Sequence, residues 1–401
     1  MKILHTSDWH FGQEFYSYDR TEEHESFLKQ LRDIVSQEQP DVMVVSGDIY
    51  HNATPSNTVM RMFTDGLERV CRACPTMQVV VTAGNHDSSS RLEISRNIWS
   101  HLGVHVIGRI EKRDDMVDFD RHIIAIHDKQ DNLCGYVVAI PHVFAHSFPI
   151  INPDTPREER MQMFFTVLGE RLKEINTQHL PVVMMAHMAI TGSDITGHDE
   201  IRGGMEYMDL STINVDYDYL ALGHIHCPQN INNNTRYCGS PIPVSFDERY
   251  PHSLTIVELD GKDSEPQLRT IHIDNPWPLK TIPTDAVPFD EALTLLTDYP
   301  NEEKAYIRLH VQLDDVAPHN ANERAVQAIE GKCCRFCCFK WERTCDKGDE
   351  NRTFTDIEQM KSQSPVDIAS IYYSNKYGHP MDDNLKEMLT QVVREVESSE
   401  I

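Results

Sequence analysis

Aspartate, histidine and asparagine residues recur at the ends of short apolar runs in the amino-terminal part of this 401-residue chain. In chain order these ends read Asp8-Trp9-His10, Gly47-Asp48, Gly84-Asn85-His86-Asp87, His187 and Gly223-His224-Ile225-His226. One Asp-X-His or His-X-His is common by chance, whereas five such ends in one chain are not. Carboxylate, imidazole and amide groups together suit Mn²⁺, Fe or Zn²⁺, while Mg²⁺ prefers oxygen ligands and its own waters. The pattern therefore predicts a site for two divalent ions.

Two divalent ions about 3.5–4 Å apart suit the hydrolysis of a phosphate ester, because they activate a water and relieve the charge on the phosphate oxygens. Such a pair needs an anionic ligand between the ions, and an aspartate carboxylate has two oxygens for that purpose. Glycine precedes Asp48, Asn85 and His224, and it lets the chain turn sharply off a strand so that the side chains converge. The pattern favours a two-metal phosphoesterase.

The apolar runs before these residues are typical of buried strands. They cover Ile3–Thr6, Val42–Ser46, Val79–Thr82, Val182–Ala186 and Tyr219–Leu222. Apolar residues at helical spacing predict helices over 27–35, before Pro40, and over 59–70. Alternating strands and helices predict an α/β fold, a buried sheet with helices on both faces. Ligand-binding residues in such folds lie just past the carboxyl ends of strands, where this pattern places them.

A proline-rich stretch over 275–288 predicts a domain boundary. Two helices and an alternating strand over 289–329 then predict a small α+β unit. In that strand we expect the apolar residues to face inward and Arg308 and His310 to face outward. From residue 346 the chain is polar, and the segment from Leu385 to Val396 then carries an apolar stripe at helical spacing. The stripe suits packing on its own domain or on a partner helix.

The overall charge is strongly acidic. The chain has 63 Asp plus Glu against 37 Lys plus Arg, a formal net charge of −26. This excludes a bare basic nucleic-acid binder, although metal ions or a basic partner can supply positive charge. The amino terminus has no signal peptide, and no apolar run approaches the ~20 residues of a membrane span. We therefore expect a cytoplasmic protein with reduced thiols and no membrane contact.

One cluster of cysteines admits two interpretations. It consists of Cys333, Cys334, Cys337 and Cys338. A Cys-X-X-Cys pair is a common zinc motif. The surrounding sequence is typical of a strand, however, and neighbouring strand residues point to opposite faces, so four thiols do not converge easily. Plain packing is the favoured interpretation.

The ordered motifs resemble those of the calcineurin-like metallophosphoesterases, and the whole chain resembles their SbcD-type nuclease subunits, the bacterial counterparts of the double-strand-break repair nuclease. The stretches 5–12, 222–226 and 237–248 carry the resemblance, and the last is the most specific. It implies a sandwich of two mixed β-sheets flanked by helices, with a small α+β capping domain and a helical carboxyl-terminal tail. We expect a nuclease domain over 1–275, a DNA-facing capping domain over 276–345, and a linker with partner-binding helices over 346–401.

The resemblance also implies roles for the site residues. The metal ligands would be Asp8, His10 and His226 for one ion, Asn85, His187 and His224 for the other, and Asp48 as the bridge. His86 would act on the phosphate as a general acid or charge stabiliser, and Asp87 would orient its ring. His51 would be a second imidazole near the phosphate. A solvated loop histidine is the alternative for His51, because many family members have an acidic residue there.

The activity that the resemblance implies is a Mn²⁺-dependent DNA nuclease, with Mg²⁺ as the other candidate ion. It would be a 3′ to 5′ double-strand exonuclease and a single-strand and hairpin endonuclease, acting in DNA end processing, replication and recombination. Its partner would be an SbcC-type ATPase that gates the nuclease with ATP and whose coiled coil binds the carboxyl-terminal helices. A homodimer within a heterotetramer is expected. The alternative is a stand-alone dinuclear-metal phosphatase or cyclic-nucleotide phosphodiesterase, which would not need the extra domain and tail.

Other residues near these motifs have less specific interpretations. The loop that carries Tyr16, Tyr18 and Arg20 suits contact with a DNA backbone or capping of the sheet. His5 lies inside a strand and is expected to be a packed neighbour of the site, and His142 is a candidate to approach the site from an adjacent loop.

The second predicted helix offers a candidate dimer face. Met60, Met62 and Phe63 lie on it, although a core stripe explains their spacing nearly as well.

Overall fold

The computed structural model describes residues 1–114, 116–197, 207–313 and 317–343, with a few single residues between 370 and 390. The chain forms two compact units, one of Met1–His310 with Asn320–Lys340 and the other of Val311–His319 with Trp341–Ile401. The domain boundaries expected near residues 275 and 345 stay predictions. In the part of the chain that the structure describes, no helix is long and apolar enough to span a membrane.

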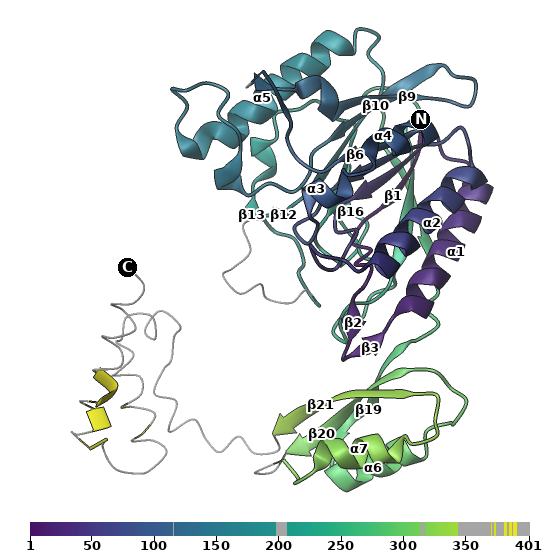
Figure 1. The fold of residues 1–401 in the computed structure, drawn as a ribbon, viewed down its shortest axis with the longest axis vertical. Coiled ribbons are helices and arrows are strands. Elements are labelled where there is room, and N and C mark those ends of the chain that lie inside the picture. The colour runs from purple at the N-terminus through teal and green to yellow at the C-terminus, as the bar shows by residue number, and fades with distance from the viewer. Residues whose placement is uncertain are drawn as a thin grey trace. The chain divides into compact units, whose positions relative to one another are not determined.

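Two six-stranded mixed sheets form the framework of the first unit (Figure 1). The first sheet has the order β18 (Gln267–His272), β17 (Ser253–Glu258), β1 (Lys2–Thr6), β4 (Val42–Ser46), β5 (Gln78–Thr82) and β6 (Val104–Ile107). The second has the order β15 (Gln229–Asn232), β16 (Thr235–Tyr237), β14 (Tyr219–Gly223), β11 (Val182–His187), β10 (Leu133–Ala139) and β9 (Ile123–His127). The strands β1, β4, β5 and β6 are parallel, as are β16, β14, β11 and β10.

The residues of each strand alternate between two hydrophobic layers. One face of each sheet packs against the other sheet, through residues that include Ile3, Val44, Val80, Val137, Val183 and Ala221. The outer face of the first sheet packs on α1 (Thr21–Glu38) and α2 (Asn57–Ala73), which lie side by side in Figure 1. The outer face of the second sheet packs on α5 (Arg160–Ile175).

This arrangement confirms the α/β sandwich of two mixed sheets that the family resemblance implied. A single sheet with helices on both faces was the wrong expectation from the apolar runs, because a second sheet covers one face of each.

Local signals in the sequence set the ends of these helices. Helix α1 ends where Gln39 adopts a left-handed conformation (φ 48°), directly before Pro40. Helix α2 begins after Ser56, whose side chain accepts a hydrogen bond from the Val59 amide. Short helices α3 (Ser89–Leu92) and α4 (Arg96–Trp99) follow β5. Short strand pairs are β2 (Glu14–Phe15) with β3 (Tyr18–Asp19), β7 (Lys112–Arg113) with β8 (Met116–Val117), and β12 (Ala189–Ile190) with β13 (Tyr207–Met208).

A third sheet has the order β19 (Leu279–Val287), β20 (Tyr306–Leu313) and β21 (Arg335–Arg343), and α6 (Phe289–Thr297) and α7 (Ala321–Ala328) lie together beside it (Figure 1). The outward orientation expected for Arg308 and His310 in β20 is wrong, since only 7% and 5% of them is exposed. Arg308 donates to the Asp247 carboxylate at 3.0 Å and lies over the Phe246 ring. Both faces of β20 are therefore covered.

The loop that carries the three candidate DNA contacts also holds the third sheet. The Tyr18 hydroxyl donates to the Phe336 carbonyl at 3.0 Å, and Arg335 donates to the Asp19 carbonyl at 3.0 Å. Arg20 is 1% exposed and forms an ion pair with Glu23. Burial and this partner exclude Arg20 as a DNA phosphate contact and support a capping loop, while DNA contact stays a prediction for the exposed Tyr16.

The cysteine cluster supports the packing interpretation. Cys337 and Cys338 lie in β21 and pack against a cluster that contains Trp277 and Tyr306, while Cys334 is buried just before the strand. Within the described ranges, the groups of side chains able to hold a metal ion consist of aspartate and histidine.

The two main sheets approach each other closely at their carboxyl ends, and glycine permits this approach. A Cβ atom at Gly223 would lie 1.9 Å from the Ser46 carbonyl oxygen, and one at Gly47 would lie 2.2 Å from Nδ1 of His187. A hydrogen bond from the Ser46 hydroxyl to the Ala221 carbonyl joins the sheets at this level. Because Gly47 and Gly223 have no Cβ atom, the two sheets can lie this close together.

Substituting Gly223→Ala should lower the free energy of unfolding by about 3 kcal/mol, since overpacking against a fixed backbone atom is at the costly end of its range. Urea unfolding of the full chain measures this change. The matched control is Gly261→Ala, where an added Cβ meets nothing within 4 Å and the change should stay within about 0.5 kcal/mol. Equal stability of the two variants would contradict the close approach.

Candidate metal centre

The carboxyl ends of β1, β4, β5, β11 and β14 bring all seven predicted ligands to one place. Six of them are buried, namely Asp8, His10, Asp48, His187, His224 and His226. Four are held in the left-handed region, with φ of 54° at Asp8, 47° at His10, 51° at Asp48 and 95° at His224. Non-glycine residues in this region carry strain that clusters at functional sites. The local backbone is thus bent so that these side chains converge.

The first predicted ligand group is compact. Ligand atoms of Asp8, His10 and His226 all lie within 4.8 Å of one another. The Nε2 atoms of His10 and His226 are 3.2 Å apart, and the Asp8 carboxylate accepts the His224 amide at 3.1 Å. The structure therefore brings together the three side chains expected to hold one ion.

The second predicted group centres on the side-chain oxygen of Asn85. This oxygen lies 2.9 Å from Nε2 of His187 and 3.0 Å from Nδ1 of His224. The Asp48 carboxylate oxygen Oδ2 is 3.4 Å from Nε2 of His187 and 3.7 Å from Nε2 of His10. Asp48 thus lies between the two groups, in the position expected of a bridging ligand.

The hydrogen bonds around His187 show that the donor set fits a cation. Its Nδ1 donates to the Ser46 carbonyl at 2.8 Å, so in the neutral ring Nε2 presents a lone pair. That lone pair faces the oxygens of Asn85 and Asp48. Electron pairs that face one another in a buried site need a positive charge between them. A divalent ion meets this need, and histidine ligands are commonly fixed by a carbonyl in this way.

The electrostatics of the metal-free centre lead to the same conclusion. Burial lowers the pKa of His187, but the Asp48 and Asp8 carboxylates and the Ser46 carbonyl together outweigh burial and raise this pKa to about 9. Burial opposes ionisation of Asp48, yet His187 and its neighbours bring the pKa of that carboxyl well below its usual value. A proton on His187 therefore supplies positive charge where an ion would, and binding an ion would displace it.

Glu248 is a candidate functional residue that the sequence reasoning did not assign. Its side chain is buried, accepts the Nδ1 proton of His226 at 3.1 Å and accepts the Val244 amide at 2.9 Å. A carboxylate on the far nitrogen fixes the tautomer of a ligating histidine and directs its Nε2 toward the ion. The signal in the sequence was the specific stretch over 237–248, which ends at this residue.

Three histidines lie at the edge of the first group. Ligand atoms of His10, His51 and His86 lie within 4.8 Å of one another, and His51 and His86 are half-buried. Their rings stack at 5.5 Å with an interplanar angle of 21°. Nδ1 of His86 donates to the His51 carbonyl at 2.8 Å. The structure thus places both imidazoles, predicted as catalytic groups, beside the ligands.

The predicted contact between Asp87 and the His86 ring is wrong. The Asp87 carboxylate accepts the backbone amides of Ile49, Tyr50 and Gly84, at 2.9–3.1 Å. The His51 carbonyl orients His86 instead. Asp87 holds together the two loops that carry His51 and His86.

The remaining histidines fall into two classes. His5 is fully buried, and its Nδ1 lies 2.9 Å from the Tyr219 hydroxyl, which confirms a packing role. His142 lies beside the second group, with its ring centre 5.9 Å from that of His187 and 6.3 Å from that of His224. The sequence had made it a minor candidate for this position.

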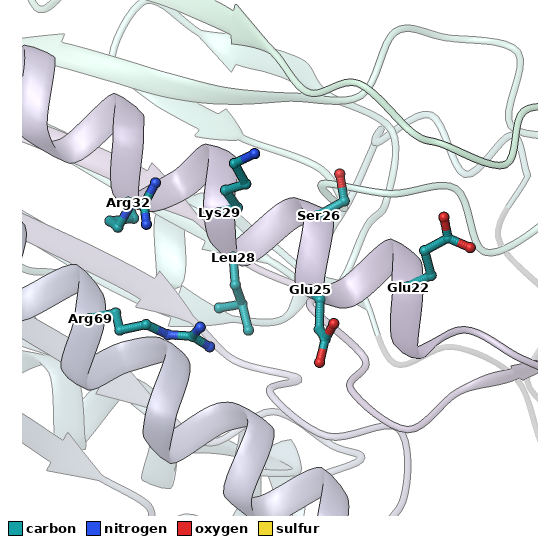
Figure 2. Close-up of a pocket in the computed structure, with 7 residues that line it drawn as sticks. All are labelled: Glu22, Glu25, Ser26, Leu28, Lys29, Arg32 and Arg69. Carbon is teal, nitrogen blue, oxygen red and sulfur yellow. The ribbon is translucent and has the colours of Figure 1, made fainter.

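A separate hollow lies on the helical side of the first sheet. Figure 2 shows its lining, which comes from α1 and from Arg69 of α2. The α1 residues are Glu22, Glu25, Ser26, Leu28, Lys29 and Arg32. This lining mixes charges of both signs and contains none of the predicted site residues, so the hollow is not part of the centre.

Substituting Glu248→Gln should weaken binding of one Mn²⁺ ion about tenfold or more, because His226 loses the carboxylate that fixes its tautomer. Calorimetric titration of the full chain with Mn²⁺ measures the two affinities. The control is Glu265→Gln, an exposed glutamate, which should bind both ions like the unmodified chain. Unchanged affinities in Glu248→Gln would show that this carboxylate does not support a ligand.

Comparison with known proteins agrees with this centre. The family model "Calcineurin-like phosphoesterase" matches residues 1–228, which include every predicted ligand. The SbcD nuclease subunit of Rhodobacter capsulatus is 32% identical over 332 residues, 78% of this chain and 81% of that protein. The protein of the same name from Escherichia coli K12 is 29% identical over 352 residues, 82% of each chain, and that of Bacillus subtilis is 29% identical over 279 residues, 66% of this chain and 67% of that one. The chain is a metallophosphoesterase, and it belongs to the calcineurin-like phosphoesterases and, within them, to the family of SbcD nuclease subunits.

Proposed function

We propose that this protein is the nuclease subunit of a DNA-processing complex, with two Mn²⁺ ions and an SbcC-type ATPase as its partner. It would act as a 3′ to 5′ exonuclease on duplex ends and as an endonuclease on single strands and hairpins, in replication and recombination. The observation that carries the proposal is Asp48 between two ligand groups, with two imidazoles beside them. The relatives are named as nuclease subunits, which supports a nucleic acid as the substrate.

The proposal assigns six buried residues and the exposed Asn85 to holding the ions. Asp8, His10 and His226 would hold one, Asn85, His187 and His224 the other, and Asp48 both. Bound ions supply an activated water and neutralise charge on the phosphodiester oxygens. The chain contributes a fixed geometry, because Ser46 and Glu248 lock the rings of His187 and His226.

His86 is the residue we assign to the phosphate itself. The N–H at Nδ1 of His86 donates a hydrogen bond to the His51 carbonyl, so Nε2 is the ring atom that can face a substrate. From there it would donate a proton to the leaving oxygen or stabilise charge on the phosphate. Burial, together with the neighbouring His86, lowers the pKa of His51, so this ring stays neutral at pH 7. A neutral His51 stacked on His86 positions that ring without competing for the phosphate charge.

The partner is proposed from charge and from the tail. A net charge of −26 leaves much of the DNA affinity to another subunit. In the tail, Leu385 and Met388 are 40% and 63% exposed, as a partner-binding stripe requires, and the stripe beyond residue 390 lies outside the described residues. We propose that this segment binds the coiled coil of the ATPase, whose ATP turnover gates the nuclease.

A homodimer within the complex is also proposed, and its face needs one correction. Phe63 is 4% exposed and belongs to the core under α2, so it cannot contribute to a dimer surface. Met60 and Met62 are only partly buried there. The segment 94–99 lies next to α2, because its Trp99 packs on Phe63. This segment carries the exposed Ile94 and Ile98. Met60, Met62, Ile94 and Ile98 are the candidate face.

Substituting His86→Ala should lower kcat on a blunt, end-labelled duplex by about 10²–10⁴-fold, the usual contribution of a positioned acid or base. Its metal content should stay near two ions per chain. Cleavage of the duplex and of a hairpin would be followed with Mn²⁺, with and without the ATPase and ATP. The control is His101→Ala, an exposed histidine, which should cleave normally.

Two outcomes would overturn the proposal. If DNA survives under all conditions while a small phosphate monoester or cyclic nucleotide is hydrolysed, the centre is a phosphatase or phosphodiesterase. If His86→Ala cleaves DNA at the unmodified rate, His86 has no role at the phosphate. The change in cleavage rate that the ATPase and ATP cause in the unmodified chain would measure the gating.

A further inference from the structure

A chain of aromatic rings leads from the metal centre to the protein surface. The loop after β10 carries His142, whose ring is roughly parallel to that of the ligand His224, with centres 6.3 Å apart. Phe144 packs edge-on against His142 at 4.9 Å, and His146 stacks on Phe144 at 5.5 Å with an interplanar angle of 20°. Two ring contacts therefore separate Phe144 from a predicted ligand.

This loop is anchored at both ends. The His142 amide donates to the Ala83 carbonyl at 2.8 Å, and Nδ1 of His142 lies 3.1 Å from the His187 carbonyl. Ala83 directly precedes the loop that carries Asn85 and His86. At the other end Phe148 is 3% exposed in the core of the second sheet. The position of Phe144 is thus tied to the centre.

Phe144 itself is 53% exposed. An exposed phenylalanine on an anchored loop leaves apolar area in water that a ligand can cover. An aromatic face beside a phosphodiesterase centre suits a nucleobase, because each base has a π-face and stacking needs no particular sequence. A nucleotide can bridge from its phosphate at the ligands to its base at Phe144.

We propose that Phe144, supported by His142 and His146, is a stacking platform for the nucleobase adjacent to the scissile phosphate. This inference rests on the proposed function. Contact between Phe144 and a base would let the centre distinguish a nucleic acid from a simple phosphate ester. In a chain with few basic residues, stacking adds affinity that does not depend on charge. The platform would favour ends whose terminal bases are unpaired, since only an unstacked base can reach the ring.

The test compares single-stranded oligonucleotides that carry either a base or an abasic residue next to the scissile phosphate. The unmodified chain should bind the base-bearing strand about tenfold more tightly, within the range for one base on an aromatic ring. Phe144→Ala should bind the two strands equally, and Phe144→Trp should restore the preference. A 2-aminopurine at that position should lose fluorescence with the unmodified chain and keep it with Phe144→Ala.

The control is Ile150→Ala, which removes an equally exposed aliphatic side chain from the same region and should keep the preference. An equal preference for the base in the unmodified chain and in Phe144→Ala would overturn the inference. If Phe144→Ala kept the preference for the base and lost only its binding to the ATPase, the inference would be overturned too. Phe144 would then be assigned to a protein contact. Failure of the proposed function looks different, because the oligonucleotide would then remain uncleaved whatever its binding.

Discussion

The crowding of lone pairs around Asp48 is the constraint on which the rest of the structure depends. The buried Asp48 faces the rings of His10 and His187, and the oxygen of the more exposed Asn85 also faces His187. Such an arrangement is stable only around positive charge. The second sheet brings His187 against the first because Gly47 leaves room for it. The carbonyls and carboxylates behind the rings then fix which nitrogen faces inward. The fold near the centre is thus arranged around charge that the polypeptide does not itself contain.

The sequence predicted the centre more fully than the fold around it. The order of the loops after β1, β4, β5, β11 and β14 was enough to predict one shared site, because polar residues seldom follow five buried strands unless they share a site. The family resemblance then named seven side chains in these loops as ligands. The same runs could not show that two sheets were present, since a strand buried under a helix and one buried under a sheet are equally apolar. Arg308 was predicted to face solvent because alternation reports polarity and not burial. Glu248 and the His86 contact were not predicted, because hydrogen bonds between distant residues leave no periodic signal.

The third sheet is connected to the centre through a short segment. Arg308 of β20 contacts Phe246 and Asp247, and the next residue, Glu248, accepts a hydrogen bond from the predicted ligand His226. Each of these contacts is short, and most of the groups that make them are buried. The orientation of His226 therefore depends on where β20 is held relative to residues 246–248. These three residues end the stretch 237–248, which carries the most specific resemblance to nuclease subunits.

Four of the predicted ligands, Asp8, His10, Asp48 and His224, have left-handed backbone conformations. Each costs roughly 1–3 kcal/mol that the surrounding structure must offset. Glycine adopts positive φ without steric cost and would relieve this strain at each of the four positions. The strain at these four positions is therefore a cost to folding that the chain carries where its predicted ligands lie.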